Sequence, residues 1–600
     1  MKPARRSSWV AAVASLAVFA LLLAGLLWFR ADTLQTTYGR TVGCDDCFVG
    51  NVMIHDLTYL SVLLLAALGG FWLRPRLLSL PLRLLALAGL LVYGLDVVVA
   101  QQFATRLRFG DMVVYGAQPD VIWKHLGNTG MLAPPVLAGV AVGLTFAGLF
   151  LLLPSIGGTR SRGFIVIALL PVGGAVAGQA LHADQYVHNW ALRNVLAVNL
   201  GSGVSRPYSA ETVGRVLGAP PPSEVCTAGR EERLDLIVLI LESWSPYQSA
   251  LFGGLADWTP RLDAIARGNA YYTDFRAAGF STNEGLMGIL VGMEFLSPTK
   301  RFFELWPFET TWGLARTLPK MLAARGYRTS FLTSGNLAFS RKEQWLPDIG
   351  FEYVEGHDHP AYDGLPRLHF DAAPDHALYD RALAHLDELG DFAPRLLVIE
   401  NVSTHHPYIH PTSRKRSAEA VFRYMDSTVG DFYDALRDRD FFRHGRLLIV
   451  SDHRAMVPVG AAELAHFGPR GLSLIPAIWV GPGVPAGAVD VPFHQADILD
   501  TLERSTARRS CGASGVRDML APAESRPRCL FHARGDDRDL IDVFCPQGEA
   551  TVTLAGDDSR VSAGDGFPPH LAAEVLARIA RTRIVGDARE SAWRDAQHIR

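Results

Sequence analysis

The sequence predicts an N-terminal α-helical membrane domain of five spans followed by an extracytoplasmic α/β domain. Apolar residues concentrate before about residue 182, in five segments that approach or exceed the roughly 20 apolar residues needed to cross a bilayer. After about residue 233, short apolar runs alternate with helical patterns. This alternation favours a mainly parallel sheet that is covered by helices on both faces.

Five segments are expected to span the membrane. The first could be a signal peptide in isolation, but it is long, and it ends in Leu-Leu-Trp-Phe-Arg rather than in a small-residue cleavage site. Four further apolar segments follow it, so we expect a retained helix. The expected spans are residues 8–29, 56–75, 80–101, 131–153 and 164–182.

Lysine and arginine residues set the expected orientation. An odd number of spans places the N-terminus and two short loops on one side, and all three carry basic residues: Lys2, Arg5 and Arg6; Arg74 and Arg76; Arg160 and Arg162. Basic loops stay in the cytoplasm. The chain has only six lysines against many arginines, which suggests a GC-rich bacterial genome. We therefore expect a multi-pass protein of the bacterial inner membrane, with everything after about residue 183 on the periplasmic or extracellular side. The net charge of −3 argues against a nucleic-acid partner.

The expected domains are a membrane domain (1–182), a membrane-proximal connector (183–232), a catalytic domain (233–505) and a small α+β extension (506–600). In the catalytic domain, apolar runs predict strands at 235–241, 328–333, 395–400, 446–451 and 474–480. Helical patterns occur at 260–268, 285–293, 314–325, 376–389, 417–438 and 495–504. The extension is expected to form short antiparallel strands and a closing helix at 567–582.

Six cysteines all fall on the expected external side, where disulfides are allowed. Cys529 and Cys545 flank about 15 residues with a hairpin-like pattern, and we expect them to pair. Cys44 and Cys47 form a single C-x-x-C motif. A local disulfide or two plain surface cysteines are favoured there over a redox or metal-binding role. The remaining two cysteines, Cys226 and Cys511, are not assigned from the sequence.

Four polar residues stand where apolar runs end or a helix begins. Glu242 closes the run "LDLIVLILES", Asp452 and His453 close "RLLIVSDH", and Thr282 opens "STNEGLMGILVG". In α/β enzymes the chemistry lies where parallel strands end. Two carboxylates, an imidazole and a hydroxyl can hold a divalent cation and activate the hydroxyl. Each residue alone has an ordinary explanation, a helix N-cap or a surface dipeptide, and their joint placement favours the metal site.

These motifs resemble the lipoteichoic acid synthase and phosphoglycerol transferase family, a membrane branch of the sulfatase-like alkaline phosphatase superfamily. The resemblance covers most of residues 1–505. It implies that Thr282 is the catalytic nucleophile and that Glu242, Thr282, Asp452 and His453 bind one divalent metal, Mn²⁺ first, with Mg²⁺ or Zn²⁺ as alternatives. Ser281 is the rival nucleophile, and Thr282 is preferred because it fits the Thr-x-Glu-Gly register.

The same resemblance implies three substrate-binding residues. His405 in "THHPY" is similar to the family's His-x-Pro-aromatic motif, and Phe339 and Arg341 are similar to its aromatic-x-Arg motif. There an aromatic ring packs on the headgroup and the arginine holds the phosphate. The sequence departs from the family pattern at Phe339, where tryptophan is usual, and at Arg454, where glycine is usual.

The function implied is transfer of a phosphoglycerol-type headgroup from a phospholipid, through a threonine-linked intermediate, to a glycan or polymer acceptor. Phosphoethanolamine transfer and sulfatase-like phosphodiester hydrolysis are alternatives, and a non-catalytic glycan-binding membrane protein is a third. A true sulfatase is disfavoured because no (Cys/Ser)-x-Pro-x-Arg motif occurs near the first helix of the domain.

Overall fold

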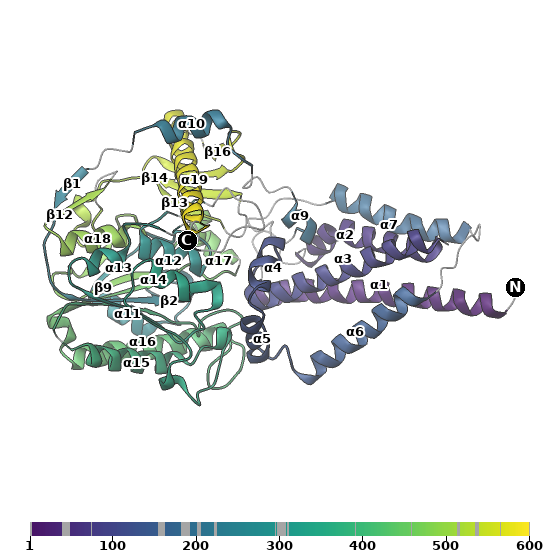
Figure 1. The fold of residues 1–600 in the computed structure, drawn as a ribbon, viewed down its shortest axis with the longest axis horizontal. Coiled ribbons are helices and arrows are strands. Elements are labelled where there is room, and N and C mark those ends of the chain that lie inside the picture. Colours follow the sequence, from purple (N-terminus) through teal and green to yellow (C-terminus); the bar gives the residue numbers. More distant parts are fainter. Residues whose placement is uncertain are drawn as a thin grey trace. The chain divides into compact units, whose positions relative to one another are not determined.

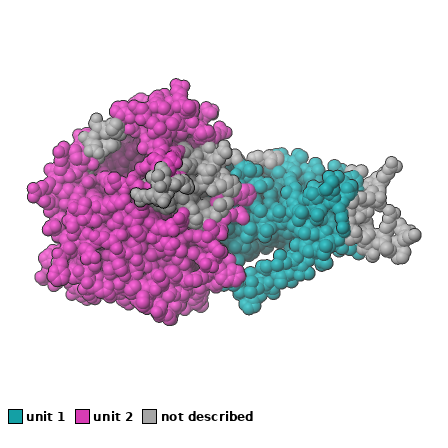
Figure 2. Space-filling model, in the orientation of Figure 1, with its two compact units in different colours: residues 1–108, 130–201, 457–465 teal, residues 109–129, 202–456, 466–600 magenta. Residues whose placement is uncertain are grey.

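In the computed structural model, the chain forms two compact units. Unit 1 comprises Met1–Arg108, Gly130–Gly201 and Val457–Ala465, and unit 2 comprises Phe109–Thr129, Ser202–Met456 and His466–Arg600 (Figure 2). The structure describes residues 3–38, 48–73, 75–153, 162–181, 193–200, 206–220, 225–294, 296, 308, 311, 313–390, 392–457, 459–512, 517–534, 539–564 and 566–598.

Unit 1 is helical. Its helices are α1 (Pro3–Tyr38), α2 (Phe48–Trp72), α3 (Arg76–Phe103), α6 (Pro134–Leu152), α7 (Arg162–Leu181) and α9 (Val195–Asn199). Within the described residues, three helical segments are long and apolar enough to cross a membrane: Val10–Asp32, Arg76–Phe103 and Pro134–Leu152. The other two expected spans contain shorter apolar stretches, Asp56–Trp72 in α2 and Ala168–Gly178 in α7. Insertion into a membrane is therefore supported, and the count of five spans stays a prediction.

Two acidic side chains that are buried in this helical unit are each paired with an arginine. Arg30 and Asp56 form an ion pair in which both side chains are buried. Tyr93 also donates a hydrogen bond to Asp56, over 2.5 Å. Asp96 and Arg106 form a second buried ion pair, at 2.6 Å. Because a buried charge is tolerated only when it is paired, these contacts explain how acidic residues are accommodated in apolar helices.

Unit 2 is built on a mixed eight-stranded sheet that has helices on both sides (Figure 1). Its strand order is β10–β3–β9–β8–β2–β7–β5–β6. The strands are β2 (Asp235–Leu241), β3 (Ala270–Tyr272), β5 (Arg328–Thr333), β6 (Tyr353–Glu355), β7 (Arg395–Glu400), β8 (Gly445–Ser451), β9 (Ala477–Val480) and β10 (Gly487–Val489). The central strands from β8 to β6 run parallel, whereas β9 is antiparallel to both neighbours. The expectation of a mainly parallel sheet is confirmed.

Both faces of the sheet are buried, which is why its central strands are continuously apolar. Along β2, alternate side chains enter opposite cores, because successive side chains of a strand point to opposite faces. Leu236, Val238 and Ile240 pack in one core, and Ile237, Leu239 and Leu241 pack in the other. The first core lies under α12 (Thr282–Val291), α13 (Leu318–Ala323), α14 (Lys342–Asp348) and α18 (Asp497–Thr506). The second lies under α11 (Pro260–Arg267), α15 (Asp375–Leu389) and α16 (Ala418–Asp438).

The C-terminal extension has its own antiparallel sheet, as the sequence predicts. Its strands are β13 (Leu530–Ala533), β14 (Leu540–Cys545), β15 (Gly548–Thr553) and β16 (Arg560–Ala563), and α19 (Pro569–His598) closes the chain. Shorter pairs join β1 (Val225–Ala228) to β12 (Arg509–Gly512) and β4 (Phe275–Arg276) to β11 (Phe493–His494). Further α-helices among the described residues are α4 (Phe109–Gly116), α5 (Pro119–Asn128), α10 (Ala210–Gly218) and α17 (Ala461–Phe467).

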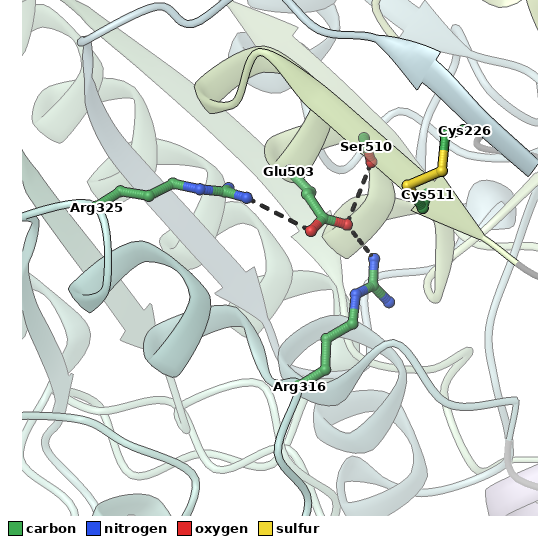
Figure 3. The surroundings of a disulfide bond; sticks show 6 residues. All are labelled: Cys226, Arg316, Arg325, Glu503, Ser510 and Cys511. Atoms are coloured by element: carbon green, nitrogen blue, oxygen red, sulfur yellow. Dashed lines mark hydrogen bonds and ion pairs between the residues drawn. A yellow bond between two sulfur atoms is a disulfide. The ribbon is translucent and has the colours of Figure 1, made fainter. Parts of the chain in front are cut away.

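Two disulfides stabilise this part of the chain. Cys529 pairs with Cys545, as expected. Cys226 of β1 pairs with Cys511 of β12, two residues that are 285 positions apart. Figure 3 shows that the second disulfide lies beside an ionic cluster, in which Glu503 accepts from Arg316 over 2.6 Å and from Ser510 over 3.2 Å. The C-x-x-C at positions 44 and 47 lies outside the described residues.

Candidate functional site

Two neighbouring parallel strands bring the expected acidic residues together. In the register of β2 and β8, Leu241 lies opposite Ser451. Glu242 follows β2 and Asp452 follows β8, so both carboxylates leave the sheet at the same edge. Their exposed fractions are 5% and 1%, and that of His453 is 0%. The Nε2 atom of His453 lies 3.3 Å from Glu242 Oε1 and 3.2 Å from Asp452 Oδ2.

Thr282 is the first residue of α12 and points its hydroxyl at this cluster. Its Oγ1 donates to Glu242 Oε2 over 3.1 Å and lies 3.5 Å from His453 Nε2. A helix N-terminus carries free N–H groups and the positive end of the helix dipole, so an anion facing Thr282 is stabilised there. The four expected metal-site residues, which lie up to 211 positions apart (242 to 453), therefore meet in space.

The neighbouring hydroxyl of Ser281 is used differently. Ser281 is the N-cap of α12 and forms a capping box with Glu284, whose Oε2 accepts from the Ser281 backbone N over 2.8 Å. The Ser281 hydroxyl also donates to Glu284 Oε2. Ser281 is thus engaged in starting the helix, whereas Thr282 contacts Glu242 and His453.

The donor set fits a divalent cation. One ligand atom from each of Glu242, Asp452 and His453 lies within 4.8 Å of the others. Within the described part of the chain, Asp452 Oδ2 is buried, and its contact with His453 Nε2 at 3.2 Å is not a well-formed hydrogen bond. Two buried carboxylates beside a single imidazole are unfavourable unless a cation neutralises them. Two carboxylates with one imidazole are ligands that Mn²⁺, Mg²⁺ or Zn²⁺ can share.

The electrostatics of the cluster also favour added positive charge. Burial and the nearby Glu242 carboxylate raise the pKa of Asp452 well above its usual range. Burial alone would lower the pKa of His453, but the Asp452 and Glu242 carboxylates raise it to about 10. The cluster therefore binds a proton tightly where the same atoms can bind a metal ion.

Surrounding groups fix the orientation of these side chains. Asp452 Oδ1 accepts from the backbone N of Ser243 and of His453, over 2.9 and 2.7 Å. His453 Nδ1 donates to the Arg454 carbonyl over 2.8 Å, which leaves Nε2 facing the carboxylates. The side chain of Gln495 donates to the Asp452 carbonyl over 2.6 Å. Such outer contacts hold ligands in place and are part of a metal site.

Several supporting residues are absent from the sequence-based prediction. Asn401, directly after β7, accepts from the Glu242 backbone N over 2.7 Å. Its position after a predicted strand was a signal that could have identified it. Glu400, the last residue of β7, forms a buried ion pair with Lys342 of α14. This pairing joins residues 58 positions apart, and no local pattern predicts it.

The three expected headgroup residues differ in what they contact. Phe339 and His405 both pack on Phe370, with ring centroids 4.3 Å and 4.9 Å away. His405 Nδ1 donates to the His406 carbonyl over 2.5 Å, so Nε2 is its basic nitrogen. Burial lowers the pKa of His405, although Glu242 opposes this shift. Arg341 is half-buried and donates to Gln344 in α14.

Residues 235–504 match the sequence profile of the family described as Sulfatase. This stretch is a sulfatase-family domain. Among solved structures, the chain is similar to a protein in the alkaline phosphatase superfamily from Vibrio parahaemolyticus, at 17% identity and a TM-score of 0.49, covering 64% of this chain and 95% of that one. It is also similar to the lipoteichoic acid synthase LtaP from Listeria monocytogenes (17% identity, TM-score 0.47, 64% and 98% covered). The phosphoglycerol transferase GacH from Streptococcus pyogenes is a third similar structure, at 12% identity and a TM-score of 0.37, covering 50% of this chain and 82% of that one.

Proposed function

We propose that this chain is a membrane-bound, metal-dependent transferase that moves a phosphoglycerol-type headgroup from a phospholipid to a glycan or polymer acceptor. The observation that carries the proposal is the contact of the Thr282 hydroxyl with Glu242 and His453 at the start of α12. A hydroxyl in that position can act as a nucleophile on a bound phosphodiester. The apolar N-terminal helices support a lipid donor, because they confine enzyme and donor to the same membrane.

In the proposed reaction, a bond forms between Thr282 Oγ1 and the headgroup phosphorus while the bond from phosphorus to the diacylglycerol oxygen breaks. The Thr282 proton leaves, and the diacylglycerol oxygen takes up a proton. An acceptor hydroxyl then attacks the same phosphorus and releases Thr282, so that the acceptor's proton replaces the one lost. A bound divalent cation, with Mn²⁺ as our first choice, would lower the pKa of the threonine hydroxyl and neutralise charge on the phosphoryl oxygens.

The chain's own residues supply the remaining functions. We assign Glu242, Asp452 and His453, with Thr282, to holding the cation, since their atoms cluster within a few ångström. The N-terminus of α12 favours the negative charge that develops at the phosphoryl group. We assign His405, Arg341 and Phe339 to binding the headgroup. In this proposal the chain spans the bacterial inner membrane five times and its sulfatase-family domain lies on the periplasmic or extracellular side.

The deciding experiment follows diacylglycerol release from fluorescent phosphatidylglycerol by the purified full-length protein in detergent with Mn²⁺. Three proteins are compared: wild type, Thr282→Ala and Ser281→Ala. We expect Thr282→Ala to abolish release. Ser281→Ala removes a hydroxyl one residue away together with half of a capping box, which costs about 1 kcal/mol of stability but leaves the nucleophile in place.

Each outcome identifies a different function. Release that needs both Thr282 and the metal supports the proposal. Release from phosphatidylethanolamine alone identifies a phosphoethanolamine transferase, and release of free glycerol phosphate without an acceptor identifies a phosphodiesterase. Metal binding without turnover on any lipid points to a non-catalytic glycan-binding membrane protein. Full activity in Thr282→Ala contradicts the mechanism.

A further inference from the structure

One helix from the N-terminal third of the chain belongs to the unit that carries the candidate site. The segments before and after it are grouped with unit 1, but Phe109–Thr129 is grouped with unit 2. This segment contains α5 (Pro119–Asn128). On α5, Val121 and His125 are buried, whereas Trp123 and Lys124 are exposed. One face of the helix therefore packs inside unit 2.

His125 of α5 contacts the turn that supports the expected headgroup residues. Its ring stacks on Phe370 with centroids 5.1 Å apart and lies 5.8 Å from the ring of His369. His125 Nδ1 also accepts from the Phe370 backbone N over 3.4 Å. Phe370 and His369 in turn contact the ring of His405, at 4.9 and 5.6 Å. The rings of His369 and Phe370 therefore contact both His125 and His405.

The supported turn has a strained backbone. Phe370 and Asp371 have φ angles of 51° and 60°, in the left-handed region that residues with side chains rarely adopt. Such conformations cost about 1–3 kcal/mol each and persist only where surrounding contacts enforce them. Some of these contacts come from within the sulfatase-family domain, where Asn336 N donates to the Phe370 carbonyl over 2.9 Å. The α5 helix adds two more: Lys124 pairs with the Asp371 carboxylate at 3.1 Å, and Asn128 donates to it over 3.3 Å.

The start of α5 contacts a second strained segment, the one that carries Phe339 and Arg341. Gln118, the N-cap residue of α5, donates a hydrogen bond from its side chain to the Ala338 carbonyl. Ser340 and Arg341 both have φ angles of 58°. The ring of Phe339 lies 4.3 Å from that of Phe370, so α5 touches both segments and they touch each other.

Burial favours the neutral form of the histidine rings in this cluster. His369 is fully buried, and neither of its ring nitrogens has a hydrogen-bond partner within the described residues. Burial and the neighbouring histidines lower the pKa of His369 well below its usual range. Burial likewise lowers the pKa of His125 to about 3. The packing of these rings is therefore apolar and aromatic rather than ionic.

We propose that α5 braces the headgroup site: it holds the segments 338–341 and 369–371 in strained conformations, so that Phe339, Phe370 and His405 form one wall. His125, which lies between two expected spans, is then a positioning residue. It orients this wall toward a ligand that carries a phosphate and a polyol. The identity of that ligand rests on the proposed function, whereas the bracing itself does not. A sulfatase-family domain produced without α5 would lack this wall.

Two measurements test the brace on the full-length protein in detergent with Mn²⁺. The first is hydrogen–deuterium exchange of wild type, His125→Ala and Trp123→Ala. Trp123 is the matched control, since it lies on the same helix and is 62% exposed. In His125→Ala we expect residues 366–372 and 402–408 to exchange about tenfold faster, as loss of one packing contact and one hydrogen bond predicts. In Trp123→Ala, the exchange rates of these two segments should equal those of the wild type.

A second variant distinguishes a local effect of α5 from general unfolding of the protein. Gln118→Ala removes the contact with the Ala338 carbonyl, so faster exchange should be confined to residues 337–341. The second measurement is binding of glycerol phosphate and the kinetics of lipid turnover. In His125→Ala we expect a Kd for glycerol phosphate and a KM for lipid raised about tenfold, with kcat within about twofold of wild type, because positioning rather than chemistry is lost.

The outcomes separate the brace from the proposed function. Unchanged exchange at 366–372 in His125→Ala overturns the brace, whatever happens to activity. Faster exchange there, with unchanged glycerol phosphate binding, also overturns the role in the headgroup site. Faster exchange in a protein whose wild type neither binds glycerol phosphate nor turns over lipid supports the brace and overturns the proposed function.

Discussion

Lys342 and Glu400 form a buried ion pair next to the candidate metal ligand Glu242. Glu400 ends β7 and lies opposite Ile240 of β2, two residues before Glu242. The side chains of Lys342 and Glu400 are 12% and 4% exposed. Burial raises the pKa of Glu400, Lys342 opposes this shift, and Glu242 adds to it. Lys342 therefore stabilises the charged form of a third carboxylate, Glu400, beside the two carboxylates of the candidate site.

Replacing Lys342 with methionine should leave Glu400 buried without its counter-ion. Removing one partner of a buried ion pair costs roughly 3–5 kcal/mol. The unpaired Glu400 would have a folded-state pKa above its unfolded value, so the folded protein would bind the extra proton. Stability of Lys342→Met should then fall as the pH rises above the unfolded-state pKa of Glu400. Thermal unfolding across a pH series measures this.

The double variant Lys342→Met/Glu400→Leu provides the control. It removes both charges and keeps apolar volume, so most of the lost stability and the added pH dependence should disappear. If Lys342→Met alone unfolds at the wild-type temperature at all pH values, the pair contributes nothing to stability and Glu400 is protonated in the wild type.

Metal removal should destabilise the sulfatase-family domain. Because the buried carboxylates of Glu242 and Asp452 lie together with one imidazole, a cation that binds the folded state should stabilise it. At a free Mn²⁺ concentration of 100 times Kd, the gain is about 2.7 kcal/mol. Unfolding temperatures with chelator and with Mn²⁺ measure the effect, and elemental analysis gives the stoichiometry, which we expect to be one.

Asp452→Asn is the matching variant for this measurement, because it keeps the shape and removes the charge. It should lose most of the Mn²⁺-dependent stabilisation and bind less metal. An equal increase in unfolding temperature in Asp452→Asn and in wild type would place the metal elsewhere in the protein.

The site could be predicted from sequence where each residue follows its own strand or begins its own helix. Glu242 and Asp452 end apolar runs that become neighbouring parallel strands, and parallel strands bring such ends to one edge of the sheet. Apolar content predicts the β9 strand but not its antiparallel direction, since an apolar run is the same in either direction. The contacts of Lys342 with Glu400 and of His125 with Phe370 depend on tertiary packing over 58 and 245 positions.

Gly285 should be essential for the geometry of the site. A Cβ added there would lie 2.1 Å from the Asp452 carbonyl oxygen, a backbone atom that cannot move independently of the metal ligand. Gly285→Ala should therefore push the start of α12, and with it Thr282, away from Glu242 and His453. Since small misplacements of reacting groups can cost about 100-fold in rate, we expect kcat to fall by at least that factor.

A second glycine of the same helix is the control for helix propensity. A Cβ at Gly292, which ends α12 with a φ of 65°, would meet Leu499 side-chain atoms at 3.2 Å. Gly292→Ala should lower stability by about 1 kcal/mol, as alanine in a left-handed C-cap does, with little effect on kcat. Wild-type kcat in Gly285→Ala would show that the close approach of α12 to Asp452 is not needed for turnover.

The Cys226–Cys511 disulfide should stabilise the fold without affecting the chemistry. It joins β1 to β12 across 285 positions, and removing a cross-link that closes a long loop costs roughly 2–5 kcal/mol. Cys226→Ser/Cys511→Ser should therefore unfold at a lower temperature and keep its kcat at 25 °C. The nearby Glu503 still accepts from Arg316 and Arg325 in this variant, so the local structure should persist (Figure 3). A loss of kcat without a loss of stability would instead mean that the strand pair β1–β12 is coupled to the candidate site.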